Sequence, residues 1–109
     1  MSVLTPIDVG PEVIESGNVL VVITSLHCKP CKVMKPWLED LADEFGDSAK
    51  VVVVTHGVDP EFMRYAKGVK SLTGWPYTII YKDGVMAGAF FGFQTEEHYK
   101  CHIRSVMEI

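Results

Sequence analysis

The sequence is poor in basic residues and lacks any long apolar run, and both absences exclude classes of function. Its 10 lysine and arginine residues are outnumbered by 14 aspartate and glutamate residues, which gives a formal charge of −4. No basic stripe is available to neutralise phosphates, so we expect neither nucleic acid nor an anionic membrane surface as a partner. The longest apolar runs are too short to cross a bilayer, and Met1 to Pro6 show no cationic segment before an apolar signal core. The pattern predicts a cytoplasmic protein.

Cysteine is also scarce, with 3 residues in a chain of 109. An odd number argues against the disulfide framework of a small secreted protein. It favours a reactive pair and one unpaired thiol in a reducing compartment. The length and the hydrophobic fraction of 48 % are sufficient for a core that needs no disulfide staples. We therefore expect a single domain over 1–109 that is monomeric.

A strand, a helix and a second strand are expected in the first half of the chain. Residues 19–23 and 51–54 are continuous apolar runs, which are typical of buried parallel strands. Between them, apolar residues recur at helical spacing over 32–45, where Gly46 is expected to end the helix and Pro36 to kink it. The crossover that joins such strands is expected to be right-handed.

Four further parts of the chain have recognisable start and turn signals. They predict a short helix at 11–15, a helix at 60–67 that Asp59 caps, two antiparallel strands at 77–81 and 85–91 joined by Lys82, Asp83 and Gly84, and a last helix from Glu96 that Thr95 caps.

The segment Cys28-Lys29-Pro30-Cys31 lies where the first strand passes into the first long helix. Two cysteines at this spacing can close a disulfide within one helical turn, and the first sulfur then faces unpaired backbone N–H groups and the positive end of the helix dipole. Lys29 and Lys32 add positive charge, and Pro30 holds the backbone in a helical conformation. Such a thiol ionises easily, and the pattern indicates redox chemistry.

The order and spacing of several motifs resemble those of thioredoxins. The motifs are Cys28-Lys29-Pro30-Cys31-Lys32, Pro36, Gly74-Trp75-Pro76, Asp83-Gly84 and Gly92. The resemblance extends over nearly the whole chain. The chain is compact and acidic, which suggests a divergent bacterial or bacteriophage member of the family. It implies an α/β thioredoxin fold, in which helices flank a central mixed sheet and a cis-proline, Pro76, precedes the penultimate strand.

The resemblance also implies a role for each residue of the site. Cys28, nearer the helix N-terminus and expected to be the more exposed, is the nucleophile that forms a mixed disulfide with the substrate. Cys31 is the resolving cysteine. Lys29, Pro30, Lys32 and His27 tune the pair.

A substrate groove is implied beside the cysteines. Pro76 is expected to lie against the cysteine pair, and the backbone of Trp75 offers an edge along which a substrate peptide adds as a strand. Gly74 and Gly92 keep the groove shallow. No metal and no cofactor are expected beyond the disulfide of Cys28 and Cys31.

Some positions depart from the family pattern. Thioredoxins usually carry a buried aspartate six residues before the first cysteine, and here that position is Val22. The lysine that neighbours this aspartate in thioredoxins aligns with Thr55, so both members of the pair are expected to be missing. Proton transfer then needs water or His27, and an exposed surface role for His27 is an equal alternative.

The histidine and cysteine residues of the last helix have a simpler interpretation. Cys101 falls opposite the apolar stripe of that helix and is expected to be an exposed thiol without a role in the site. His98, Cys101 and His102 have helical spacing, but no fourth ligand is nearby, which favours surface residues over a metal site.

These observations predict a thiol-disulfide oxidoreductase that reduces protein disulfides and receives electrons from thioredoxin reductase or from glutathione. A glutaredoxin-like enzyme linked to glutathione is the nearest alternative. A second alternative, of a different class, is a module that uses the thioredoxin shape only for docking or assembly.

Overall fold

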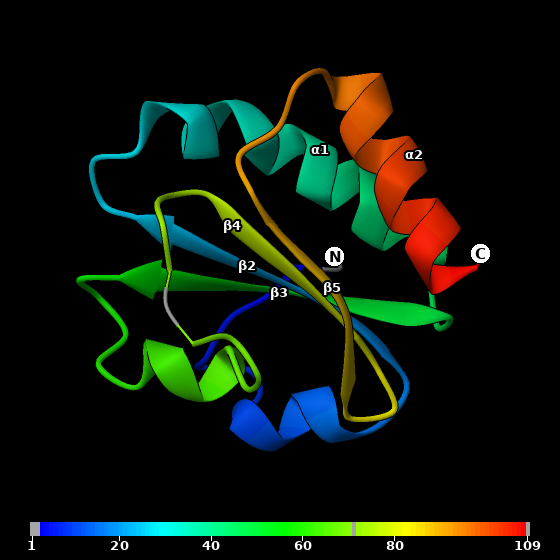
Figure 1. Ribbon diagram of the computed structural model, residues 1–109, viewed down its shortest axis with the longest axis horizontal. Helices are drawn as coiled ribbons and strands as arrows, with labels where there is room; N and C mark the ends of the chain where they lie inside the picture. The colour runs from blue at the N-terminus through cyan, green and yellow to red at the C-terminus, as the bar shows by residue number, and fades with distance from the viewer. Residues whose placement is uncertain (1–2, 71, 109) are drawn as a thin grey trace.

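A five-stranded mixed sheet separates two layers of helices in the computed structural model, which describes residues 3–70 and 72–108. The strand order is β1-β3-β2-β4-β5. The long helices α1 (Lys29–Phe45) and α2 (Glu96–Met107) lie together on one face, and the short helices η1 (Pro11–Glu15) and η2 (Phe62–Tyr65) lie on the other (Figure 1). The predicted mixed sheet flanked by helices is confirmed.

The centre of the sheet is formed by the strand-helix-strand unit that the sequence predicts. β2 (Asn18–Ser25) pairs in parallel with β3 (Ala49–His56), and β3 pairs in parallel with the short edge strand β1 (Val3–Leu4). On its other side β2 pairs antiparallel with β4 (Tyr77–Lys82), which continues into the antiparallel β5 (Val85–Phe91). Both faces of β2 are covered, which explains its continuous apolar sequence.

Alternate residues of β2 contribute to two separate hydrophobic cores. Leu20 and Val22 pack under α1 and α2, whereas Val19, Val21 and Ile23 face η1 and η2. All five side chains are fully buried. The period of two residues along a strand produces this division.

The hairpin and the last helix are confirmed in detail. Asp83 and Gly84 have φ values of 52° and 85°, so the two turn residues between β4 and β5 adopt the left-handed conformations of a tight hairpin. At the start of α2, the Oγ1 atom of Thr95 accepts a hydrogen bond from the backbone N–H of His98 at 3.1 Å. This contact is the predicted N-cap.

The short helix predicted at 11–15 is present as the 3-10 helix η1. The helix predicted at 60–67 is wrong, because only the short 3-10 helix η2 forms there. The Oδ2 atom of Asp59 accepts a hydrogen bond from the backbone N–H of Thr55 at 2.7 Å. The carboxylate is therefore directed back along the chain, where it closes the loop after β3 instead of capping a helix. None of the helices among residues 3–70 and 72–108 has the length and apolar character needed to span a membrane.

Candidate functional site

Cys28 and Cys31 are joined by a disulfide at the start of α1, with a Cα to Cα distance of 5.3 Å. Cys28 is the N-cap residue of this helix, which begins three residues earlier than the predicted start at 32. The Sγ atom of Cys28 accepts a hydrogen bond from the backbone N–H of Cys31 at 3.2 Å. The first sulfur thus occupies the place that a serine or aspartate oxygen takes at many helix starts, where backbone N–H groups and the helix dipole favour negative charge.

The two cysteines are buried to the same degree, and each retains 8 % of its surface exposed. The prediction that Cys28 is the more exposed is therefore wrong for the disulfide form. The capping contact and the disulfide both draw the Cys28 side chain toward the helix, which removes the expected difference. The assignment of Cys28 as the nucleophile then depends on its place at the helix N-terminus and not on its exposure.

The four predicted tuning residues surround the disulfide at the surface. His27, Lys29, Pro30 and Lys32 are all exposed, and Pro30 lies in the first turn of α1. The charges of Lys29 and Lys32 act on the cysteines through solvent, which makes their effect weaker than that of a buried charge. Pro30, the second residue of the helix, has no backbone N–H, so the capping hydrogen bond to Cys28 comes from the N–H of Cys31.

Of the predicted groove residues, Gly74, Trp75 and Pro76 lie just before β4 and Gly92 directly follows β5. The bond between Trp75 and Pro76 is cis as expected. Tyr77, the next residue, pairs with Ile23 near the end of β2, so this segment and the cysteine turn lie at the same edge of the sheet. The carbonyl of Pro76 accepts a hydrogen bond from the N–H of Gly92 at 2.8 Å. Direct contact between Pro76 and the disulfide stays a prediction.

Two aromatic contacts shape the groove segment. A Cβ atom on Gly74 would lie 2.5 Å from the ring of Phe91, so the absence of a side chain at Gly74 lets that ring pack against the backbone. The ring of Trp75 stacks on the ring of His56, with 4.9 Å between centroids and 20° between planes. Phe62 meets both rings edge on. No sequence pattern indicates that His56 is a neighbour of Trp75, because the two residues are far apart in the chain.

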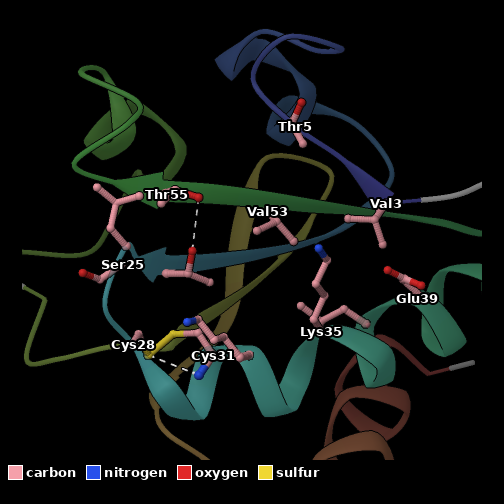
Figure 2. Close-up of a pocket in the computed structure, with 13 residues that line it drawn as sticks. Val3, Thr5, Ser25, Cys28, Cys31, Lys35, Glu39, Val53 and Thr55 are labelled. Atoms are coloured by element: carbon pink, nitrogen blue, oxygen red, sulfur yellow. Dashed lines mark hydrogen bonds between the residues drawn. A yellow bond between two sulfur atoms is a disulfide. The ribbon is translucent and has the colours of Figure 1, made fainter.

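A cavity of about 350 Å³ lies behind the disulfide, between α1 and the β1, β2 and β3 strands (Figure 2). Both cysteines line it, together with Thr24, Thr55, Lys35 and Glu39 among others. Thr24, Lys35 and Glu39 are not among the site residues predicted from the sequence. Lys35 and Glu39 follow Cys31 at intervals of four residues, which places all three on one side of the helix, and this spacing was the available signal.

The strand register corrects the expectation about the missing charged pair. Val22 lies opposite Val53, and Thr55 lies opposite Thr24, so Thr55 is not the neighbour of Val22. Val22 is fully buried in the core under α1 and α2. No ionisable group therefore occupies either Val22 or the position opposite it.

Cys101 in the last helix is an exposed free thiol, as the sequence predicts. The rings of His98 and His102 stack with 6.4 Å between centroids on the surface. Within residues 3–70 and 72–108, no group of three histidine, cysteine or acidic side chains is arranged to hold a metal ion.

Comparisons with known proteins point to one family. The family model described as Thioredoxin matches residues 5–105. Thioredoxin from Staphylococcus epidermidis is 34 % identical over 85 residues, which are 78 % of each chain. Thioredoxin from Bacillus subtilis is 31 % identical over 81 residues, 74 % of each chain.

Two further relatives extend the comparison. Thioredoxin X, chloroplastic, from Arabidopsis thaliana is 36 % identical over 73 residues, a match that covers 66 % of this chain but only 38 % of the plant protein. A solved mutant thioredoxin from Halobacterium salinarum superimposes with a TM-score of 0.73 at 23 % identity, and it covers 99 % of this chain and 93 % of that one. The structural match shows the fold.

Proposed function

Because the chain belongs to the thioredoxin family of thiol-disulfide oxidoreductases, we propose that it reduces disulfide bonds of other proteins and is itself reduced by thioredoxin reductase. The observation that carries this proposal is the disulfide of Cys28 and Cys31, closed at the N-terminus of α1 with Cys28 as the cap. Members of this family use their own cysteine pair as the redox group, so the exchange needs no external cofactor.

The first step is the attack of the Cys28 thiolate on one sulfur of a substrate disulfide. A bond forms between Cys28 and that sulfur, and the other substrate sulfur leaves as a thiolate that takes up a proton. The N–H of Cys31, which donates to the Cys28 sulfur at 3.2 Å in the disulfide, is placed to donate to the thiolate in the reduced form. This contact and the helix dipole favour ionised Cys28.

The second step is carried out by Cys31. After it loses its proton, its sulfur attacks Cys28, the bond between the two cysteines forms, and the bond between Cys28 and the substrate breaks. The second substrate sulfur then leaves as a thiolate, so the substrate has gained two electrons and the cysteine pair has lost two. The spacing within one turn of α1 brings Cys31 into reach of Cys28 without a rearrangement of the backbone.

The substrate peptide is proposed to lie along the segment of Gly74, Trp75 and Pro76, with Gly92 beside it. This segment precedes β4 and is at the same edge of the sheet as the cysteine turn. A peptide in extended form can pair with such a backbone edge. The stacking of the Trp75 ring on the His56 ring restricts rotation of the Trp75 side chain and thereby keeps the segment in place.

The charged and rigid residues around the pair are proposed to adjust its reactivity. Lys29 and Lys32 favour the ionised form of Cys28 through solvent, Pro30 fixes the first turn, and His27 places an imidazole next to Cys28. We further propose that the chain is a monomeric single domain over 1–109 and works in a cytoplasmic, reducing setting.

Reduction of insulin disulfides tests the function directly. The purified protein is supplied with electrons either from NADPH and thioredoxin reductase or from glutathione and its reductase, in parallel. Turnover with thioredoxin reductase supports the proposal. Turnover with glutathione alone identifies a glutaredoxin-like enzyme instead. No turnover with either donor, despite a reversible disulfide, favours a docking or assembly role.

A further inference from the structure

The cavity behind the disulfide joins the buried Cys31 to solvent. Cys31 lines it, and so do the exposed residues Lys35 and Glu39, which places its mouth at the surface of the molecule. Its volume of about 350 Å³ is far more than one water molecule needs. Polar groups are also present on its walls, and a buried water site requires both room and polar partners.

One wall of the cavity is a row of side chains on α1. Cys31, Lys35 and Glu39 follow one another at intervals of four residues, so they lie along the same side of the helix. Figure 2 shows the Lys35 side chain extending from α1 across the cavity toward β3. Its ammonium group therefore lies in the space between α1 and the strands.

The opposite wall contains a pair of hydroxyl groups. Thr24 of β2 and Thr55 of β3 are register partners, and their Oγ1 atoms are 3.2 Å apart, as the dashed line in Figure 2 shows. Only one of the two hydroxyl hydrogens can lie between these oxygens. The pair consequently keeps one donor and further lone pairs for another partner in the cavity.

We propose that this cavity is the proton exit for Cys31, in which the Thr24 and Thr55 hydroxyls hold the water that takes the proton and Lys35 stabilises the thiolate that remains. The inference rests on the proposed function and deepens its second step. The S–H bond of Cys31 breaks, its proton passes to the held water and on to bulk solvent, and its sulfur keeps the electron pair that forms the bond to Cys28. Lys35, Thr24 and Thr55 act through Cys31 and are positioning residues.

The charged groups that face this cavity among the residues described come from α1. They are Lys32, Lys35 and Glu39. The strands β1, β2 and β3 and the segments next to them contribute apolar side chains and hydroxyls, namely Val3, Thr5, Thr24, Ser25, Leu26, Val53 and Thr55. Two acids are hydrogen-bonded to lining residues: Asp59 accepts from the backbone N–H of Thr55, and Asp8 accepts from the backbone N–H and the hydroxyl of Thr5. Lys35 is singled out because it follows Cys31 by one helical turn and reaches across the cavity.

The test uses a small aromatic disulfide, dithiobis(nitrobenzoate), and the reduced protein in a Cys101→Ser background. Attack by Cys28 releases one coloured thiolate at a rate that depends on reagent concentration, and resolution by Cys31 releases a second at a rate that does not. Stopped-flow absorbance separates the two phases between pH 5 and 9. The assay needs neither insulin nor a reductase, so a failure of the cavity variants can be told apart from a failure of the parent protein.

In Lys35→Met, the pH midpoint of the second phase is expected to rise by about one unit, because a nearby positive charge no longer favours the thiolate. In Thr24→Val/Thr55→Val, the second phase is expected to slow at least about tenfold at all pH values, since the proton acceptor is no longer held. Thr24→Ser/Thr55→Ser, which keeps both hydroxyls, restores the rate. The first phase stays within about twofold of the parent in each variant.

Matched controls are Lys50→Met, an exposed lysine near the opposite end of β3, and Thr73→Val, an exposed threonine that does not line the cavity. Both are expected to behave like the parent. A second phase that is unchanged in the cavity variants, or slowed together with the first phase, overturns the proposal. If the parent itself lacks two phases, the proposed function fails as well.

Discussion

The backbone N–H of Cys31 donates a hydrogen bond to the Sγ atom of Cys28 at 3.2 Å, so the first cysteine of the pair caps the helix that carries the second. One sulfur therefore has two tasks, since it closes the N-terminus of α1 and it takes part in exchange. The helix start and the redox pair are the same structural feature.

Substitution of Cys28 should separate the cap from the chemistry. Cys28→Ser keeps an oxygen that can accept the N–H of Cys31, whereas Cys28→Ala does not. We expect the alanine variant to be less stable than the serine variant by about 1 kcal/mol, and both to be inactive toward insulin. Urea unfolding of the two variants under the same reducing conditions measures the difference. Equal stability would show that the capping contact does not contribute to the free energy of unfolding.

The buried pair of Thr78 and Tyr99 should show strong coupling. Their hydroxyls are 2.9 Å apart and connect β4 to α2, and burial raises the pKa of Tyr99 despite the opposing hydrogen bond from Thr78. Tyr99→Phe alone leaves the Thr78 hydroxyl without its partner and should cost about 1 to 2 kcal/mol. The double variant Thr78→Val/Tyr99→Phe should cost clearly less than the sum of the single variants. Additive losses in urea unfolding would contradict this account.

The ion pair of Glu44 and Arg104 joins α1 to α2 and should contribute stability that depends on pH. The guanidinium donates to both carboxylate oxygens, at 2.5 and 2.6 Å, and this hydrogen bonding lowers the pKa of Glu44. A lowered folded-state pKa means that the contribution is present above the unfolded pKa of about 4.3 and is lost as pH falls through the folded value. Glu44→Gln should cost only about 0.5 kcal/mol at pH 7, because the pair is partly exposed.

The difference between Glu44→Gln and the parent should disappear in strongly acidic solution. Glu15→Gln, a change of an exposed glutamate on η1, is the matched control for the loss of one negative charge. A difference that persists unchanged at low pH would show that the ion pair is not its cause.

Gly74→Ala tests the contact between the groove segment and β5. The new Cβ would lie 2.5 Å from the Phe91 ring, so that ring must move. Phe91 is 57 % exposed and can rotate away, which limits the expected loss of stability to about 1 kcal/mol. In a Phe91→Ala background the ring is absent, so Gly74→Ala should cause no loss of stability through this contact. Thermal unfolding of the four proteins measures the coupling, and an equal cost in both backgrounds would place the strain elsewhere.

Local signals in the sequence predicted most of the fold. The helix of α2, its Thr95 cap and the turn at Asp83 and Gly84 are determined by neighbouring residues, and all three are confirmed. A local signal also produced the wrong prediction of a helix at 60–67. Asp59 followed by Pro60 is typical of a helix start, but the Asp59 carboxylate bonds to the backbone of Thr55 instead.

The cysteine pair could be predicted from its spacing, but its surroundings could not. The cavity wall requires the register of β2 on β3, which places Thr24 against Thr55 across 31 positions of the chain. The equal exposure of Cys28 and Cys31 depends on the packing of the closed disulfide, which no local pattern specifies.

The central claim is that Cys28 attacks the disulfides of other proteins and that Cys31 resolves the product. Its most direct test is covalent trapping of insulin, measured by intact mass spectrometry under non-reducing conditions. Reduced Cys31→Ser in a Cys101→Ser background should accumulate an adduct with an insulin chain that dithiothreitol cleaves, and reduced Cys28→Ser in the same background should not. An adduct through Cys31 in the Cys28→Ser protein at equal yield, or no adduct with either variant, would contradict the account.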